Sequence, residues 1–204
     1  MAAPKLDLYR EHKSEYVAPK KPVLVEVGPA RYLAVEGQGA PGNEAFTVGV
    51  SALYGAAFTI KMTRKLAGLG DYKVCQLEGL WWSDRPGDFV GLPPELWRWK
   101  LLIRTPDFVT DSDLAAAVEQ LIKKGKGAEV RRVTLESIHE GTCVQMLHVG
   151  AYADEGRTVD LMHRFAEEKG LTFHGPHHEI YLSDPRRVPP ERLRTILRHP
   201  VGKK

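Results

Sequence analysis

The chain has 204 residues, of which 43% are hydrophobic and 27% charged, and its formal net charge is +3. This composition is ordinary for a globular protein, and the charge is too small and too scattered to indicate a nucleic-acid-binding surface. No apolar run approaches the roughly 18 residues of a membrane span, and charged residues stand where a signal peptide has its apolar region. We therefore expect a cytoplasmic protein that contacts neither membranes nor nucleic acid directly.

The first third of the chain predicts an arm, a strand region and a long helix. Residues 1–20 are polar and aperiodic, so we expect a loosely held arm. Residues 22–37 are β-branched and interrupted by Gly28 and Pro29, which indicates one bent strand or two short ones. After Asn43, a typical helix cap, apolar residues recur at helical spacing: Phe46, Val50, Leu53, Tyr54, Ala57 and Phe58.

The middle of the chain predicts two strands, a loop and a helix. The stretch "YKVCQLEGLWW" (72–82) has the composition of a strand, and the Pro/Gly-rich loop at 83–94 is long enough to cover a cavity. Apolar and charged residues alternate over 96–104, as in a half-buried strand. Over 111–124 the apolar residues share one helical face and a glycine follows, which predicts a helix.

The last third predicts three strands and two helices. We expect strands near 129–136 and 141–149, a helix at 157–169, and a strand over "HHEIYLSDP" (177–185). The stretch "VPPERLRTILRHPV" (188–201) carries Pro190 where a helix would begin, and predicts a short closing helix.

The same order of elements occurs twice. From Arg31 to Trp82, and again from Thr142 to Ser183, a strand leads to a helix and then to a strand that holds one glutamate beside aromatic residues. We therefore predict an α+β fold of two similar units. In such a fold Glu78 and Glu179 would take related positions and face a shared cleft.

Strand alternation predicts which side chains accompany each acid. Glu78 shares a strand face with Trp82, and Glu179 shares one with Tyr181. A carboxylate beside an aromatic ring suits a flat, partly cationic organic molecule, because the ring stacks and the acid neutralises charge. Candidates for the remaining walls are Trp97, Trp99, Tyr54, Phe58 and Met146.

A structural interpretation competes with this one. Aromatic residues at strand spacing usually belong to a core, and a glutamate in a strand is usually solvated or paired with a basic side chain. For Glu179 the basic partner would be Arg186 or Arg187. The recurrence of an acid and an aromatic residue in two strands favours the functional interpretation.

Metal and cofactor sites are not predicted. His174, His177 and His178 stand close to Glu179, but alternation sends His177 and His178 to opposite strand faces, which spoils a shared metal site. The two cysteines, Cys75 and Cys143, lack metal-ligand spacing, and we interpret them as reduced core residues. The glycines of "VEGQGAPGNEAF" lack the spacing of a phosphate-binding loop, so we expect no cofactor.

Three segments carry a resemblance to a known family. "LEGLWW", "WRWKLLIRTPDFVT" and above all "EIYLSDPRRVPPERLRTILRHPV" resemble the GyrI-like family of small-molecule-binding proteins, over about residues 20 to 201. The resemblance implies two tandem strand–helix–strand–strand modules with pseudo-twofold symmetry around a central ligand cleft. Here the single domain would cover 21–204, with modules at about 21–108 and 125–204, behind the arm at 1–20.

The resemblance also implies roles for individual residues. Glu179 matches the family's cleft glutamate that meets cationic ligands, and Tyr181 matches the aromatic residue two positions on. Glu78, Trp81 and Trp82 match the "EGLWW" motif of stand-alone members. A complete one-component transcription regulator is not expected, because only about twenty polar residues precede the domain.

Three functions follow as hypotheses. The leading one is a binding protein for aromatic, often cationic, small molecules. The second is a hydrolase that opens the cyclopropane ring of DNA-alkylating natural products, with Glu179 or Glu78 as general base and Tyr181 as hydrogen-bond donor. The third is an interaction protein that protects or inhibits DNA gyrase.

Overall fold

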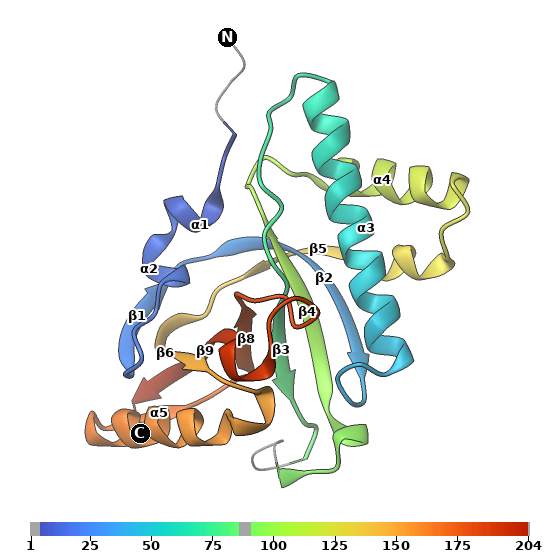
Figure 1. Cartoon of the computed structure of the whole chain (residues 1–204). Coiled ribbons are helices and arrows are strands. Elements are labelled where there is room, and N and C mark those ends of the chain that lie inside the picture. The colour runs from blue at the N-terminus through green and yellow to red at the C-terminus, as the bar shows by residue number, and fades with distance from the viewer. Residues whose placement is uncertain (1–4, 86–90, 204) are drawn as a thin grey trace.

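The computed structural model describes residues 5–85 and 91–203 as an α+β fold built on one large antiparallel sheet. The strand order is β1-β6-β9-β8-β3-β4-β2-β5, and β7 pairs with the C-terminal end of β9. Figure 1 shows α3 along one half of this sheet and α5 along the other, with β3 and β8 between them.

The predicted elements of the first half are present with shifted ends. The two short strands that Gly28 and Pro29 allow are both formed, and Asn43 caps the long helix, with its Oδ1 accepting the Phe46 N–H at 2.8 Å. The elements are β1 (Val23–Val27), β2 (Ala30–Gln38), α3 (Glu44–Leu66), β3 (Glu78–Trp82), β4 (Arg98–Thr105) and α4 (Asp111–Lys123). Of the loop predicted at 83–94, residues 86–90 lie outside the described residues.

The second half differs from prediction at two places. Residues 128–132 form a 3-10 turn rather than the start of a strand, and the predicted closing helix is wrong. The elements are β5 (Thr134–Ile138), β6 (Gly141–Val149), α5 (Gly156–Glu168), β7 (Leu171–Phe173), β8 (His177–Tyr181) and β9 (Arg194–Lys203). Pro190 begins only a 3-10 turn, Pro190–Arg192, because the residues after it alternate between the two faces of a sheet and pair with both β6 and β8.

The pairing order repeats on either side of the β3–β8 contact. In the first half β2 leads through α3 to β3 and β4, and in the second β6 leads through α5 to β8 and β9. Each half also carries one additional edge strand, β5 beside β2 and β1 beside β6. Apart from the short strand β7 between α5 and β8, the closing strand β9 therefore gives the second half the same connectivity as the first.

All three long helices cover one face of the sheet. Leu101 on β4 packs in the core under α3, and the residues paired next to it in successive strands are Gly79, Glu179 and Leu197. Leu197 in turn packs with Met162 of α5. Directly paired residues point to the same side of a sheet, so α3 and α5 lie on one face and flank the centre of that face.

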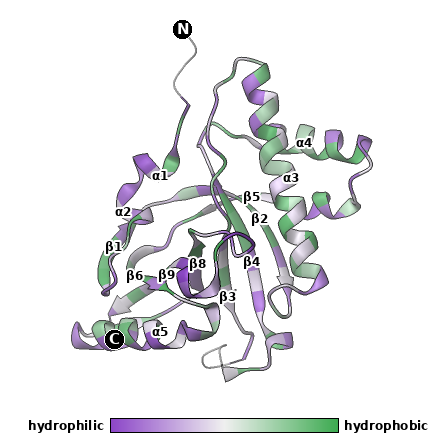
Figure 2. Cartoon of the chain, in the orientation of Figure 1, coloured by the Kyte–Doolittle hydropathy of each residue, from purple (hydrophilic) through white to green (hydrophobic). Residues whose placement is uncertain are grey.

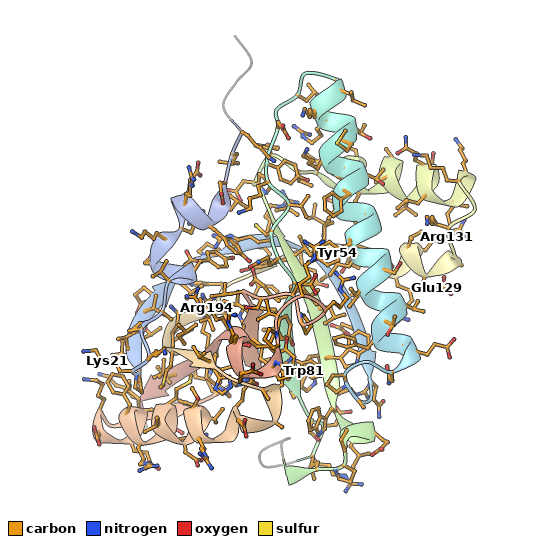
Figure 3. All side chains as sticks on the ribbon, viewed as in Figure 1. Lys21, Tyr54, Trp81, Glu129, Arg131 and Arg194 are labelled. Carbon is orange, nitrogen blue, oxygen red and sulfur yellow. The ribbon has the colours of Figure 1, made fainter. Side chains whose placement is uncertain are left out.

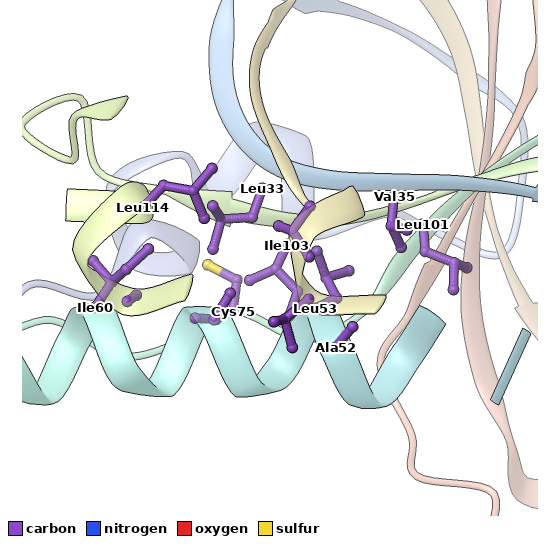
Figure 4. Close-up of a cluster of buried hydrophobic side chains, with 14 of the residues drawn as sticks. Leu33, Val35, Ala52, Leu53, Ile60, Cys75, Leu101, Ile103 and Leu114 are labelled. Carbon is purple, nitrogen blue, oxygen red and sulfur yellow. The ribbon is translucent and has the colours of Figure 1, made fainter. Parts of the chain in front are cut away.

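The larger core lies between α3, α4 and strands β2 and β4. Figure 4 shows Leu53 and Ile60 of α3 against Ile103 and Leu33, and all four are at most 1% exposed. By length and composition alone α3 is apolar enough to cross a membrane, with a mean hydropathy of 1.3. Its buried face packs on the sheet, as in the core helix of a globular domain. Figure 2 shows α4 and α5 alternating between hydrophilic and hydrophobic residues, as expected of helices with one buried face.

The opposite face of the sheet is covered by the N-terminal segment. Residues 8–16 form two short helices, α1 (Leu8–Glu11) and α2 (Lys13–Tyr16), instead of the predicted loosely held arm. Leu8 is 5% and Tyr16 4% exposed, and the Tyr16 ring packs with Ile180 and Ile196. These buried contacts hold the segment in place. They were not predicted because the sequence of the segment is mostly polar and has no regular spacing of apolar residues.

Candidate functional site

The register between β3 and β8 decides where the two predicted acids lie. Glu78 pairs with Ile180, and Gly79 pairs with Glu179. Because successive residues of a strand point to opposite faces, Glu179 lies on the helix-covered face and Glu78 on the face covered by the N-terminal segment. The expectation that both acids face one cleft is therefore wrong.

Glu179 lies in a hydrogen-bonded row at the centre of the helix-covered face. The Trp81 indole N–H donates to the Tyr181 hydroxyl at 3.1 Å, and that hydroxyl acts by hydrogen bonding to lower the pKa of the Glu179 carboxyl group. A Cβ at Gly79 would lie 2.9 Å from the Trp81 indole nitrogen and 3.0 Å from the Tyr181 oxygen. A glycine is needed here because any side chain would displace these two rings.

Aromatic rings surround this row. Trp81 makes an edge contact with Trp97, with ring centroids 6.1 Å apart, and stacks with Phe46 of α3 at 5.9 Å. Tyr181 makes an edge contact with Tyr152 at 5.9 Å. We call Glu179 and these five aromatic residues the Glu179 cluster. Figure 3 labels Trp81, which lies between the ribbons of α3 and α5 in this view.

Glu179 has no Lys or Arg partner among the described residues. Arg186 and Arg187, its predicted structural partners, pair with Asp184 instead, at 2.9 and 3.7 Å. His177 lies 3.8 Å from Glu179, but burial, with the neighbouring histidines, lowers the pKa of His177 to about 3 and keeps its ring neutral.

The Glu179 side chain is 13% exposed, and its environment favours the protonated acid. Burial raises the pKa of Glu179 to about 7, against the opposing effects of the Tyr181 hydrogen bond and the charge of His178. A carboxyl group of this kind can exchange protons near neutral pH, and it can become a full anion when a cation replaces the missing basic partner.

Glu78 has the opposite environment. It is fully buried, accepts a hydrogen bond from the Tyr16 hydroxyl at 3.0 Å, and pairs with His178 at 3.1 Å. Burial disfavours a charged imidazole, but the carboxylates of Glu140 and Glu78 outweigh it and raise the pKa of His178 to about 9. Glu78 therefore faces a cation that the fold supplies.

The ion pairs around Glu78 extend to the N-terminal segment. Glu140 bridges His178 at 3.0 Å and Arg198 at 2.9 Å, while Arg104 donates to Glu15 of α2 at 2.6 Å. The Arg198 guanidinium also donates to the main-chain oxygen of Glu15 at 2.5 Å. We call this set the Glu78 network: Glu78, His178, Glu140, Arg198, Arg104, Glu15 and Tyr16. Its contacts are those of a buried structural anchor.

The other predicted site residues are distributed over both faces. Trp99 is fully buried beneath α3, and Met146 lies in the core under α5. Tyr54 is half-buried on α3, where it stacks with Phe58, which is 53% exposed. Trp82 lies on the Glu78 side of β3 and packs against the cluster of Tyr32 and Leu102.

Sequence reasoning missed three members of the helix-covered site. The helical spacing predicts only that Phe46 lies in a helix, and no sequence motif singles out Tyr152 or Glu155. Glu155 is 8% exposed, and the charge of Glu179 acts on it. Nothing in the local sequence distinguishes Glu155 from an ordinary acid near a helix N-terminus, where negative charge is generally favourable.

Two surface pockets lie outside the Glu179 cluster. One, of about 410 Å³, is lined by Trp82, Asp84 and Arg98 with neighbouring residues of β2. The other, of about 470 Å³, lies between the start of β1 and the end of α5. Within residues 5–85 and 91–203, no three His, Cys, Asp or Glu side chains are grouped as metal ligands. The chemistry on the helix-covered face is thus that of a carboxyl group among stacked rings.

Comparisons with known proteins agree with this architecture. A protein from Listeria innocua is 42% identical, with a TM-score of 0.91, and the match covers 97% of this chain and all of that one. A second Listeria innocua protein, described as a hydrolase, is 41% identical with a TM-score of 0.87, over 97% of this chain and all of that one. The C-terminal domain of EcmrR is 10% identical with a TM-score of 0.61, over 90% of this chain and 98% of that domain, and shares the fold. No curated protein matches the chain.

The family model that matches residues 103–201 is that of the GyrI-like small molecule binding domain. The matched region includes β8 with Glu179 and Tyr181, together with most of the closing strand β9. The chain belongs to the GyrI-like small-molecule-binding domain family.

Proposed function

We propose that this protein binds flat, aromatic cations at the Glu179 cluster. The observation that carries the proposal is the buried Glu179 carboxyl group, which lacks a Lys or Arg partner among the described residues and lies among aromatic rings. A bound cation would supply the missing charge and stack on the rings. Trp81 and Tyr181 are the rings closest to the acid in the hydrogen-bonded row.

Binding requires the cluster to open. Tyr181 is half-buried and Trp81 only 2% exposed, so a ligand of several rings needs neighbouring groups to move. Tyr152, which is 39% exposed and contacts Tyr181 only at its edge, is the ring that can swing away with the least loss of packing. The aromatic edge contact it would give up is worth about 1 kcal/mol, which stacking on a ligand can replace.

Tryptophan fluorescence tests the proposal. Ethidium, a planar aromatic monocation, should quench the emission of Trp81 and bind the wild-type protein saturably. Glu179→Gln should weaken binding at least tenfold, while Glu191→Gln, which alters an exposed acid in the turn before β9, should leave it unchanged. Equal affinities for all three proteins would overturn the assignment of Glu179.

A second candidate function is hydrolysis of a strained ring. It is favoured by the 41% identity to a protein described as a hydrolase and by the raised pKa of Glu179. Glu179, as general base, would take a proton from water while the water oxygen attacks a cyclopropane carbon. The ring bond breaks towards a conjugated carbonyl oxygen, which gains charge and then a proton. Tyr181 would donate a hydrogen bond to that oxygen after leaving Glu179.

Mass spectrometry separates the two candidates. Incubation with a cyclopropane-containing alkylating compound should give product heavier by one water if the protein is a hydrolase. Wild-type protein that forms this product, and a Glu179→Gln variant that does not, would establish turnover. A saturable complex without product would leave binding as the function.

Three further expectations concern the symmetry of the fold, the location of the protein and a protein partner. We propose that the repeated connectivity of the two halves reflects a pseudo-twofold relation, with modules at about 21–108 and 125–204 in one domain. A cytoplasmic location and a contact with DNA gyrase stay predictions. Co-purification of a topoisomerase with the tagged protein would test the gyrase contact.

A further inference from the structure

We propose that Glu155 is a second acidic ligand-binding group of the Glu179 cluster, and that the site therefore accepts aromatic compounds carrying two positive charges. This inference rests on the proposed binding of cations at Glu179. It adds a second anionic group to the site and names the class of ligand that would use both acids.

The Glu155 side chain is buried without serving as a helix cap. It stands at the N-cap of α5, where the shorter side chains of Ser, Thr, Asp or Asn commonly accept a hydrogen bond from the first turn. Glu155 makes no such capping bond. Its side chain is instead buried, and its Oε1 atom has no hydrogen-bond partner among the described residues. Burying a carboxyl group in this way costs free energy unless another group forms a hydrogen bond or an ion pair with it.

The side chains around Glu155 are those of the Glu179 cluster. Tyr152, one turn earlier, touches Tyr181 with its ring. Thr195 of β9 pairs with Tyr181 in the sheet register and approaches Glu155, although its hydroxyl also lacks a partner that meets hydrogen-bond geometry. The charge that acts on Glu155 is that of Glu179. The contact between the Tyr152 and Tyr181 rings thus brings the segments that carry Glu155 and Glu179 to one part of the helix-covered face.

None of the groups that face Glu155 supplies a fixed cation. On β8 these are Glu179 and Tyr181, with the neutral His177 on the same strand face, and on the preceding turn it is Tyr152. On β6, His148 is bonded through both ring nitrogens, to Thr158 and to the main-chain oxygen of Ala151. Beyond β8, Asp184 is paired with Arg186 and Arg187. Within the described residues, Glu155 forms no ion pair with Lys or Arg.

Without a ligand, the ionised form of both acids is disfavoured. Burial and the charge of Glu179 raise the pKa of Glu155, and burial raises the pKa of Glu179. One positive charge can ionise one carboxyl group. A second charge on the same ligand would release the second proton, so the preference for a dication should grow with pH by up to about tenfold per unit.

Ethidium and propidium form a matched pair of probes. They share one phenanthridinium ring, and propidium carries a second, quaternary ammonium on its side chain. In wild-type protein, the affinity of propidium relative to ethidium should rise several-fold per pH unit between about pH 7 and 9. In Glu155→Gln this rise should disappear, whereas Glu191→Gln, which alters an exposed acid outside the cluster, should keep it.

Calorimetry of the wild-type protein gives a second readout that needs no variant. Titrations in two buffers of different ionisation enthalpy should show that propidium releases about one proton more than ethidium. Equal proton release, or the same pH-dependent preference in Glu155→Gln, would overturn the role of Glu155 while Glu179-dependent ethidium binding keeps the proposed function. Absence of saturable binding of either dye would overturn both.

Discussion

Neighbouring residues of one strand, His178 and Glu179, face two different environments. On the His178 side, Glu78 is enclosed by a charged histidine and a tyrosine hydroxyl, and ion pairs continue to Glu140 and Arg198. On the Glu179 side, the carboxyl group has a tyrosine hydroxyl but no fixed cation among the described residues. A buried acid whose charge is balanced by the fold is structural, whereas one whose charge is left unbalanced is available to a ligand.

The largest expected effect is on stability and concerns Glu78, the acid whose charge is balanced by the fold. Glu78→Gln removes one partner of a buried ion pair and leaves the charged His178 with Glu140 alone, so the free energy of unfolding should fall by about 3 kcal/mol. Glu179→Gln should change it by less than about 1 kcal/mol, because an amide replaces a carboxyl group that has no cation. Urea denaturation of both variants measures the contrast, and equal losses would mean that the two acids play the same role.

The next effect is a pH dependence of stability. The pKa of His178 is raised from 6.5 to about 9. The stability that its charged form contributes is therefore complete below about pH 6.5 and is lost as the pH rises through 9. The loss should be on the order of 3 kcal/mol. The raised pKa values of Glu155 and Glu179 act in the same direction, so the measurement belongs in the Glu155→Gln, Glu179→Gln double variant. A flat stability from pH 6 to 10 in this variant would contradict the charged state of His178.

A smaller effect is expected from the Tyr181 hydroxyl. Tyr181→Phe keeps the ring but removes the hydrogen bond that favours the ionised form of Glu179. Affinity for ethidium at pH 7 should fall by about threefold to tenfold, and the pH at which binding is half-maximal should move upwards. Titrations at several pH values give both quantities. A downward shift would show that the hydroxyl does not donate to Glu179.

Much of the fold could be predicted from the sequence because its signals are local. Asn43 with the helical spacing after it predicted α3, and the alternation around Trp99 predicted β4. The closing strand was mistaken for a helix because Pro190 resembles a helix start, and its pairing with β6 and β8 is made by residues far away in the chain.

The candidate site was predictable only in part. Alternation placed Glu179 and Tyr181 on one strand face, and the register of β8 against β9 agrees with this. It could not reveal the register of β3 against β8, which separates Glu78 from Glu179, because pairing between distant strands depends on the whole sheet. Glu15 and Arg104 resemble surface charges in the sequence, so the buried anchor of the N-terminal segment was invisible as well.

We propose that the Glu179 carboxylate pairs with a cationic ligand instead of a basic side chain of the protein. The direct test compares ethidium with its uncharged phenanthridine parent, each titrated against wild-type protein and Glu179→Gln near pH 8. Deleting the charge should weaken ethidium by a Coulomb energy of ~1–4 kcal/mol, on the order of tenfold to several hundredfold in affinity. The uncharged parent should lose much less, because stacking on Trp81 and Tyr181 remains. Equal losses for the two compounds would contradict the account.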